Sequence, residues 1–131
     1  RREALVYLFD IFPTLCALLG LDVPASVDGQ SLLGALQRDE AVRQEMYLAY
    51  ERLHRGLRDR QHKLIEYQID GRRHTQLFDL AADPHELRDL AADPACEAVL
   101  ADMRTRLALQ RDAWGDGQTT WGETFWGGME Y

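Results

Sequence analysis

The chain has 131 residues, of which 46% are hydrophobic, and this is enough to bury a modest core without disulfides or metal staples. Its 22 acidic residues outnumber the 15 basic ones, and the formal charge of -7 argues against a general attraction to nucleic acid or to an anionic membrane surface. No apolar run reaches the ~20 residues that span a bilayer. We therefore expect no nucleic-acid partner and no membrane partner. The sequence does not indicate a compartment.

The first third of the chain predicts two helices joined by a loop. Asp10 is a good N-cap for a helix over 11–19, and Gly20 is a typical residue to end it. This helix is so apolar that a small domain would not cover it unaided, and we expect a partner surface upstream in sequence. After a loop rich in turn residues, Ser31 predicts the start of a short helix that runs through Leu36.

The middle of the chain predicts an antiparallel sheet of about four strands. Residues 65, 67 and 69 are apolar or aromatic and alternate with more polar neighbours, which is typical of a strand with one buried face and one mixed face. Asp70-Gly71 indicates a hairpin between this strand and the next, and residues 72–74 are expected to lengthen the connection. The strands that we expect cover 46–53, 56–58, 62–69 and 76–80.

The last third predicts a long helix and then a tail of a different character. Asp93 and Pro94 are suited to the N-cap and the first position of a helix, and apolar residues recur at helical spacing from Cys96 to Trp114. We expect this helix to pack across the sheet. Beyond Gly115, glycines alternate with dense aromatic residues and no period is present, which predicts an irregular arm packed on its own domain. A ligand or partner contact is the alternative.

Four short motifs stand in a definite order along the chain. Residues 10–15 read Asp-Ile-Phe-Pro-Thr-Leu and residues 28–33 read Asp-Gly-Gln-Ser-Leu-Leu. Residues 58–65 have the form R-D-x-x-x-K-L-I, and residues 77–86 read Leu-Phe-Asp-Leu with a following Asp-Pro-x-Glu. In this order the motifs resemble the carboxy-terminal portion of the sulfatase family, in the alkaline phosphatase superfamily. The resemblance covers about residues 6 to 113; Asp89 departs from it, because the family often has asparagine there.

The resemblance implies an α+β fold, in which a small antiparallel sheet of about four strands is packed by a C-terminal helix. The preceding helices would then be left over from an α/β main domain. On this basis we divide the chain into 1–45 as the end of the main domain, 46–114 as a C-terminal subdomain with the sheet and the helix, and 115–131 as the glycine and aromatic tail.

The catalytic centre of a sulfatase is expected outside this chain. The resemblance implies a formylglycine, made from cysteine or serine in a C/S-x-P-x-R motif, whose hydrate attacks sulfur beside a divalent metal, usually calcium. Neither Cys16 nor Cys96 lies in such a motif, and no serine does. The four histidines form no i, i+4 pair of the kind that holds zinc. We therefore assign no catalytic residue, no metal ligand and no cofactor to this chain; calcium and formylglycine are expected in the missing main domain.

His54 and Arg55 are the candidate substrate-binding residues. They stand in an array of cationic side chains with enough positive charge to attract a sulfate-bearing substrate. The alternative is a solvated sheet face whose charges pair with Asp59 and Glu66 and have no role in binding. The other members of the array are Arg52, Arg58, Arg60, His62 and Lys63.

Three functions follow from these observations. The first is the C-terminal part of a sulfatase that hydrolyses sulfate esters in the intact protein, where this chain completes the fold, borders the substrate pocket and has the main catalytic domain as its partner. The second is the same role in a phosphonate or phosphodiester hydrolase, because carboxy-terminal motifs do not report the nucleophile. The third is a self-standing binding or oligomerisation module, and a possible homo-oligomer, built on the apolar first helix and the aromatic tail.

Overall fold

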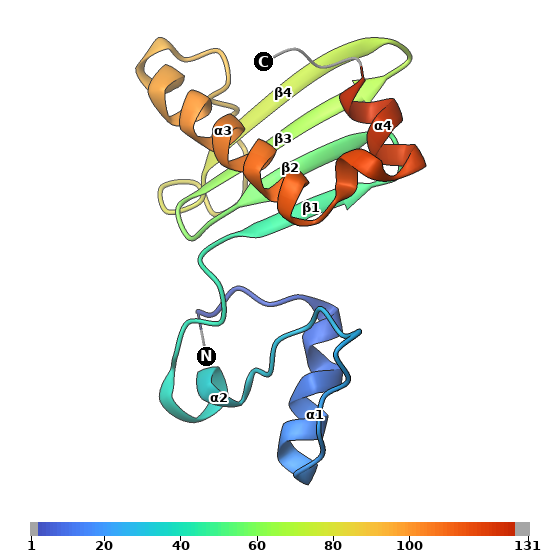
Figure 1. Ribbon diagram of the computed structural model, residues 1–131. Helices are drawn as coiled ribbons and strands as arrows, with labels where there is room; N and C mark the ends of the chain where they lie inside the picture. The colour runs from blue at the N-terminus through green and yellow to red at the C-terminus, as the bar shows by residue number, and fades with distance from the viewer. Residues whose placement is uncertain (1–2, 128–131) are drawn as a thin grey trace. The chain divides into compact units, whose positions relative to one another are not determined.

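The computed structural model describes residues 3–127 and divides the chain into two compact units, Arg1–Met46 and Tyr47–Tyr131. The first unit holds two α-helices, and the second holds a sheet with two further α-helices (Figure 1). The last residues of the predicted aromatic tail, 128–131, lie outside the described residues.

The first unit contains helix α1 (Ile11–Leu19), which follows a 3-10 turn over Leu8–Asp10, and helix α2 (Leu33–Arg38). The predicted bounds of α1 are confirmed. Gly20 ends it with φ of 67°, a left-handed conformation that glycine adopts without steric cost. Asp10 stands at the N-cap position, but its side chain makes no capping hydrogen bond. The carboxylate instead accepts hydrogen bonds from residues outside the helix.

Asp10 is fully buried and joins three parts of the first unit. Arg43 donates to both carboxylate oxygens, at 2.6 and 2.8 Å, while the backbone amides of Tyr7 and Gln30 donate at 2.7 and 2.9 Å. Burial alone would raise the pKa of Asp10, but these hydrogen bonds and the charge of Arg43 outweigh it and hold the pKa below its ordinary value. The carboxylate therefore stays ionised inside the unit.

Thr14 completes this connection one helical turn later. Its hydroxyl donates to the backbone carbonyl of Asp10 at 2.6 Å and accepts from the backbone amide of Leu32 at 2.9 Å. The first two sequence motifs are thus hydrogen-bonded to each other, since Asp10 and Thr14 belong to one motif and Gln30 and Leu32 to the other. Both motifs have a structural role in this unit.

The remaining surface of α1 is apolar and uncovered. Pro13, Thr14 and Cys16 are buried, whereas five larger apolar side chains of the same helix are between 49% and 71% exposed. An exposed apolar patch of this kind is typical of a contact surface. The five exposed residues are Ile11, Phe12, Leu15, Leu18 and Leu19.

The second unit is built on a four-stranded sheet with the strand order β1-β2-β3-β4, so that β1 and β4 are its edges. Strands β2, β3 and β4 pair antiparallel, as predicted, and the hairpin between β3 and β4 turns at Asp70-Gly71. The strands are β1 (Met46–Tyr50), β2 (His54–Arg58), β3 (His62–Ile69) and β4 (Arg72–Asp79).

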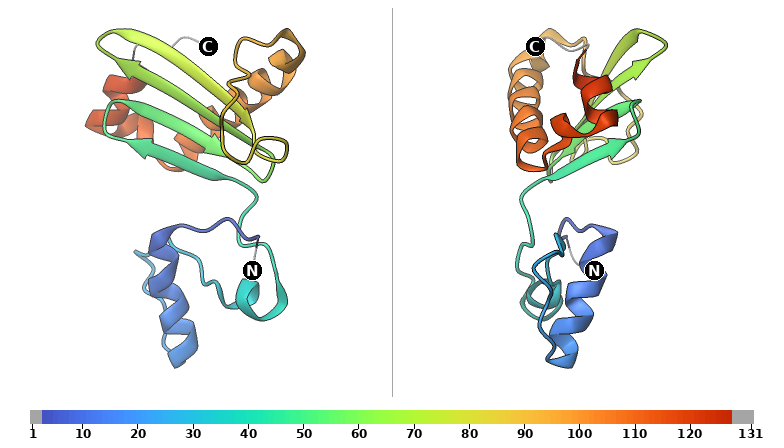
Figure 2. Two further views of the ribbon diagram at one scale, coloured as in Figure 1. Left: turned by 180° about the vertical axis from the view of Figure 1, so that it is seen from behind. Right: turned by 45° about the vertical axis from the view of Figure 1, so that its right-hand side comes forward.

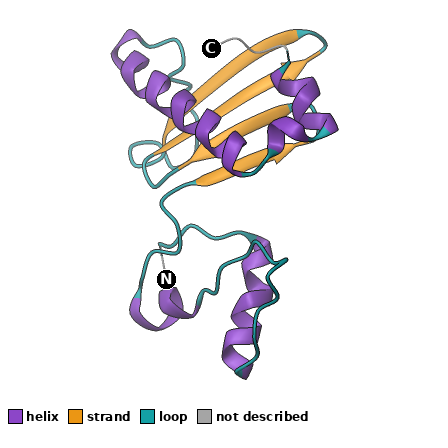
Figure 3. Ribbon diagram, in the orientation of Figure 1, coloured by secondary structure: helices purple, strands orange, loops and turns teal. Residues whose placement is uncertain are grey.

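Helices α3 (Glu97–Ala113) and α4 (Thr120–Trp126) lie on one face of this sheet (Figures 1 and 3). A 3-10 turn over Pro94–Cys96 leads into α3, with Asp93 as its N-cap, as predicted. The register places Leu57, Leu64 and Leu77 in one row across three strands, all fully buried. They form the core with Met103 and Leu107 of α3. The predicted α+β fold, with a helix packed on the sheet, is confirmed.

The other face of the sheet carries no helix of the second unit as far as residue 127 (Figure 2, left). Its side chains are those that alternate with the core row along each strand. They include His54, Tyr67 and His74, which lie opposite one another in the register of β2, β3 and β4. Of these, His74 is exposed.

The prediction of an irregular arm beyond Gly115 is wrong in one respect. Residues Asp116–Gln118 form a 3-10 turn and α4 follows, with the Thr119 hydroxyl accepting from the Gly122 amide at 3.0 Å. A Cβ at Gly122 would collide with the backbone carbonyl of Asp116, so this glycine permits a close approach within a helix. The predicted packing of the arm on its own domain is confirmed, because Phe125 is fully buried in the core.

Replacement of the buried carboxylate in the first unit should loosen that unit. For Asp10→Ala we expect a loss of roughly 3–5 kcal/mol of local stability, because Arg43 is left as an uncompensated charge. The measurement is amide hydrogen exchange at Gln30, which should become much faster. Asp22→Ala, at an exposed acidic residue of the same unit, is the control. Unchanged protection of Gln30 in the Asp10 variant would contradict a stabilising role for the hydrogen bonds around Asp10.

Candidate functional site

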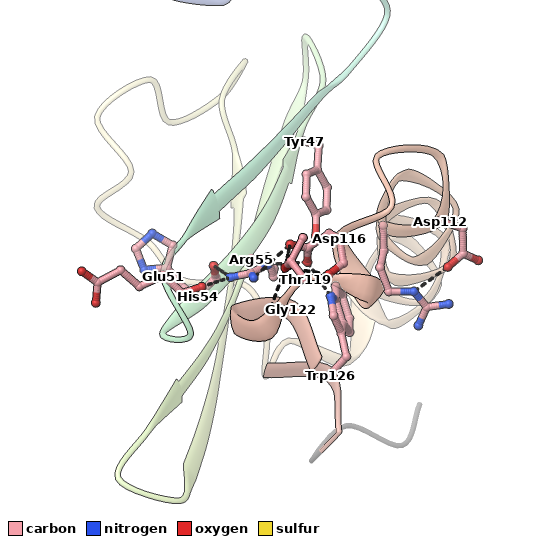
Figure 4. A network of polar contacts seen from close by, with 10 residues as sticks. Tyr47, Glu51, His54, Arg55, Asp112, Asp116, Thr119, Gly122 and Trp126 are labelled. Atoms are coloured by element: carbon pink, nitrogen blue, oxygen red, sulfur yellow. Dashed lines mark hydrogen bonds and ion pairs between the residues drawn. The ribbon is translucent and has the colours of Figure 1, made fainter. Parts of the chain in front are cut away.

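His54 and Arg55 begin β2 and point to opposite faces of the sheet, because successive side chains of a strand alternate. Figure 4 shows Arg55 reaching toward Asp116 and Trp126 on the helix side, while the His54 ring lies on the other side of the strand. The structure therefore does not bring the two predicted site residues together at one surface.

Arg55 is held in an internal ion pair. Its side chain is 1% exposed, and it donates to Asp116 through Nε at 2.7 Å and through Nη2 at 3.1 Å. Its Nη1 donates to the backbone carbonyls of Glu51 at 2.7 Å and of His54 at 2.9 Å. The guanidinium also lies over the ring of Phe125, 4.9 Å from its centroid. Arg55 thus joins the turn before β2 to the C-terminal segment.

Asp116 is the centre of this network. Besides the two bonds from Arg55, its Oδ2 accepts from the Tyr47 hydroxyl at 2.8 Å and from the Trp126 indole nitrogen at 2.7 Å. Burial would raise the pKa of Asp116, but hydrogen bonds from Arg55, Trp126 and Tyr47, with the charge of Arg55, hold it below its ordinary value. Burial and the neighbouring carboxylate raise the pKa of Tyr47, so its phenol remains a donor.

His54 belongs to a row of four rings on the opposite, helix-free face. We call these four residues the ring row; each strand contributes one of them, namely Tyr50, His54, Tyr67 and His74. Successive ring centroids lie 5.3, 5.5 and 5.9 Å apart. Burial, and then the positive charge of Arg55, lower the pKa of His54, so its imidazole is neutral near neutral pH.

A hollow in the surface adjoins the β4 end of the ring row. Within it the Tyr67 hydroxyl donates to Gln76 Oε1 at 3.0 Å. Burial raises the pKa of Tyr67, with contributions from the charges of Glu86 and Asp89, so this phenol also stays protonated. The hollow is lined by Tyr67, Ile69, Asp70, Arg72, His74 and Gln76.

Most of this site was not predicted from the sequence. Only His54 was named, whereas Tyr50, Tyr67, His74 and Gln76 were not. A signal was present, because a hairpin centred on Asp70-Gly71 sets the register that aligns His74 with Tyr67. The row could not be read from the predicted strands, because β2 begins at His54 and not at residue 56, and β4 begins at Arg72 and not at residue 76.

The other charges near the sheet pair in ways that the sequence did not predict. The carboxylates of Asp59 and Glu66 pair with Arg106 at 2.9 Å and with Arg104 at 2.7 Å, both on α3. Lys63 instead donates to Glu86 at 2.7 Å, which connects the third motif to the fourth. These pairs attach the helix and the loop after β4 to the sheet.

Asp89 fills the position at which the sequence departs from the sulfatase pattern. Its Oδ1 accepts from the backbone amides of Leu77 at 3.0 Å and Ala91 at 2.9 Å. A carboxylate oxygen serves both amides here, so the turn is fully formed with aspartate.

Within residues 3–127, no cluster of three or more histidine, cysteine or acidic side chains is placed to hold a metal ion. In the same range, no helix is long and apolar enough to cross a membrane.

Comparison with known proteins identifies the family. The family model of the N-sulphoglucosamine sulphohydrolase C-terminal region matches residues 1–113. The chain belongs to this sulfatase C-terminal family. A Delta 4,5-hexuronate-2-O-sulfatase from Bacteroides thetaiotaomicron is 33% identical over 110 residues, which are 75% of this chain and 22% of the relative.

Solved structures agree with the sulfatase assignment. A structure of a 2-O GAG sulfatase superposes with a TM-score of 0.69 and 30% identity, over 83% of this chain and 25% of that protein. The phosphonate monoester hydrolase of Agrobacterium radiobacter superposes with a TM-score of 0.63 and 27% identity, over 79% of this chain and 24% of that protein. The chain thus spans about a quarter of the length of the sulfatases that it matches.

Loss of Asp116 should destabilise the second unit strongly. For Asp116→Ala we expect the free energy of unfolding to fall by roughly 3–5 kcal/mol, since Arg55 would remain buried without its partner. Urea unfolding followed by tryptophan fluorescence measures this. Asp112→Ala, which removes an exposed carboxylate paired with Arg111, should cost less than about 1 kcal/mol. Equal losses in the two variants would show that the Asp116 network is not a major source of stability.

The His54 imidazole should titrate below the ordinary histidine value of about 6.5. Because the folded state favours the neutral ring, the stability that His54 contributes above about pH 6.5 is lost as the pH falls through its lowered pKa. NMR titration of the imidazole carbon-bound protons measures the value directly. A midpoint at or above that of an unfolded peptide would contradict the burial of His54.

Proposed function

We propose that this chain is the C-terminal part of a sulfatase that hydrolyses sulfate esters in the intact protein, where it completes the fold and borders the substrate pocket. The family match over residues 1–113 carries this proposal. The 2-O-sulfatase relative acts on a hexuronate, so we further propose that the substrate is a sulfated saccharide.

The structural part of this role falls to the first unit. The hydrogen bonds of the Asp10 carboxylate hold the first two motifs together around α1. On its exposed side, α1 carries Phe12, Leu15 and Leu18. A unit with an aliphatic and aromatic outer surface is suited to packing on a larger hydrophobic neighbour. We propose that this neighbour is the main catalytic domain of the same protein.

The pocket-bordering part falls to the second unit. His54 is half-buried, and its imidazole is available to a substrate on the helix-free face. Arg55 is enclosed by Asp116 and donates to the His54 carbonyl, so we propose that it acts by positioning the start of β2 and does not itself contact the substrate. This divides the two predicted site residues between two roles.

The chemistry itself is proposed to lie in the main domain. There, a formylglycine and a calcium ion would supply the nucleophile and the charge stabilisation for sulfate ester hydrolysis. The residues of this chain would orient the substrate and support the fold. No step of the reaction is assigned to a residue in the described range.

Phosphonate hydrolysis is the second candidate reaction. It is favoured by the structural likeness to the phosphonate monoester hydrolase of Agrobacterium radiobacter. The sequence identity to that enzyme is 27%, nearly as high as the 30% identity to the 2-O GAG sulfatase. Assays of the intact protein with matched aryl sulfate and aryl phosphonate esters separate the two reactions. A preference for the phosphonate ester would replace the sulfatase proposal with this one.

A test of the pocket role uses the intact protein with a substitution in this chain. His54→Ala should raise KM for a sulfated disaccharide about fivefold and leave kcat nearly unchanged, because it removes a binding contact of about 1 kcal/mol. His85→Ala, at an exposed histidine in the loop after β4, is the matched control. A wild-type KM in the His54 variant would show that this residue does not border the pocket.

A further inference from the structure

The ring row is accessible in a way that the core aromatic residues are not. Phe125 is fully buried and Trp126 is 9% exposed on the helix face, whereas Tyr50 of the ring row is 54% exposed. His54 and Tyr67 are half-buried and His74 is exposed. Tyr50 stacks on His54 and Tyr67 stacks on His74, while His54 and Tyr67 are tilted against each other, so the four rings form one continuous row across four strands.

The chemistry of the strip differs from that of an ordinary protein contact. The exposed surface of α1 consists of aliphatic side chains and phenylalanine, which suits another protein's core. The ring row consists of two phenols and two imidazoles, each with an apolar ring face and a polar tip. Such a surface suits a ligand that alternates apolar C–H faces with hydroxyl groups, as the pyranose ring of a saccharide does.

The hollow at the β4 end of the ring row adds polar groups at the rim. Gln76 carries an amide, Asp70 a carboxylate, and the exposed Arg72 a guanidinium. Asp70 can accept hydrogen bonds from sugar hydroxyls, while Arg72 and His74 can donate to an anionic substituent. Of the two acidic side chains whose charges act on Tyr67, Glu86 is paired with Lys63, and Asp89 accepts hydrogen bonds from backbone amides.

We infer that the ring row and its hollow bind the pyranose ring of an anionic saccharide, with the anionic substituent at Arg72 and His74. This inference rests on the proposed sulfatase function and deepens it, because it names the surface that holds the sugar. It concerns the face of the sheet and not only His54, which is one member of the row.

The test is an NMR titration of the 131-residue chain with a sulfated disaccharide at millimolar concentration, and the four histidines serve as internal probes. His54 and His74 lie in the ring row, while His62 and His85 do not. The expected result is that the imidazole signals of His54 and His74 move and the other two stay in place. Inorganic sulfate and the neutral disaccharide maltose, at equal concentration, should leave all four in place.

Several results would overturn the inference. Equal movement with inorganic sulfate would show a simple anion site, and equal movement with maltose would show that charge is not recognised. Absence of any movement would show that the face does not bind saccharide. Protection of Tyr50 from solvent in the intact protein, with no saccharide response there, would show that the face is an internal contact with another domain.

A pair of exposed aromatic substitutions provides a second measurement. Tyr50→Ala should weaken saccharide binding roughly threefold to tenfold, the change expected when one aromatic ring contact is lost. Trp121→Ala removes a ring that is 56% exposed on α4, away from the ring row, and should leave the affinity unchanged. Both changes lie outside the core, so both variants should fold. Equal affinity in the Tyr50 variant and wild type would contradict saccharide binding by the ring row.

These results separate the inference from the proposed function. An intact protein that hydrolyses sulfate esters, but in which Tyr50→Ala and wild type have the same KM for the sulfated disaccharide, would remove the inference alone. An intact protein that binds the saccharide through the ring row, but hydrolyses no sulfate ester, would remove the proposed function alone.

Discussion

The second unit depends on one buried ion pair, between Arg55 at the start of β2 and Asp116 after α3. Two charges inside a protein are costly to desolvate, and they persist only when each is fully hydrogen-bonded. Here the carboxylate accepts from Arg55, Tyr47 and Trp126, and the guanidinium also donates to two backbone carbonyls. Because these partners come from β1, β2 and α4, the pair fixes the C-terminal segment against the sheet and leaves the opposite face free for the ring row.

The first unit uses the same physical solution with other residues. Asp10 is buried and ionised, Arg43 is its charged partner, and backbone amides fill its remaining acceptor sites. In both units an ionised aspartate and its arginine partner join segments that are far apart in the sequence, and in the second unit Tyr47 and Trp126 belong both to this network and to the apolar core.

The sequence predicted the elements better than the site. Helix α1 and the bounds of strand β3 follow from local signals, namely a terminal glycine and an apolar alternation. The alternation indicated the wrong buried face, because Leu64 and Glu66 are buried whereas Ile69 is 47% exposed. The turn at Asp70-Gly71 was expected, but residues 72–74 belong to β4 and not to a longer connection. Helix α4 was not predicted, because the several glycines beyond Gly115 oppose an autonomous helix; at Gly122 the missing side chain instead permits a close approach to the Asp116 carbonyl. Arg55 and Asp116 are 61 residues apart, and no local pattern reports a pair that only tertiary structure brings together.

The free edge of the sheet has a consequence for self-association. Strand β4 lies at the edge and begins with Arg72, Arg73 and His74, all of them exposed. An unpaired strand edge is a template on which a second copy can add its own strand, and a cluster of basic residues on it opposes such growth by charge repulsion. Extension of the sheet from molecule to molecule is therefore disfavoured along this half of β4.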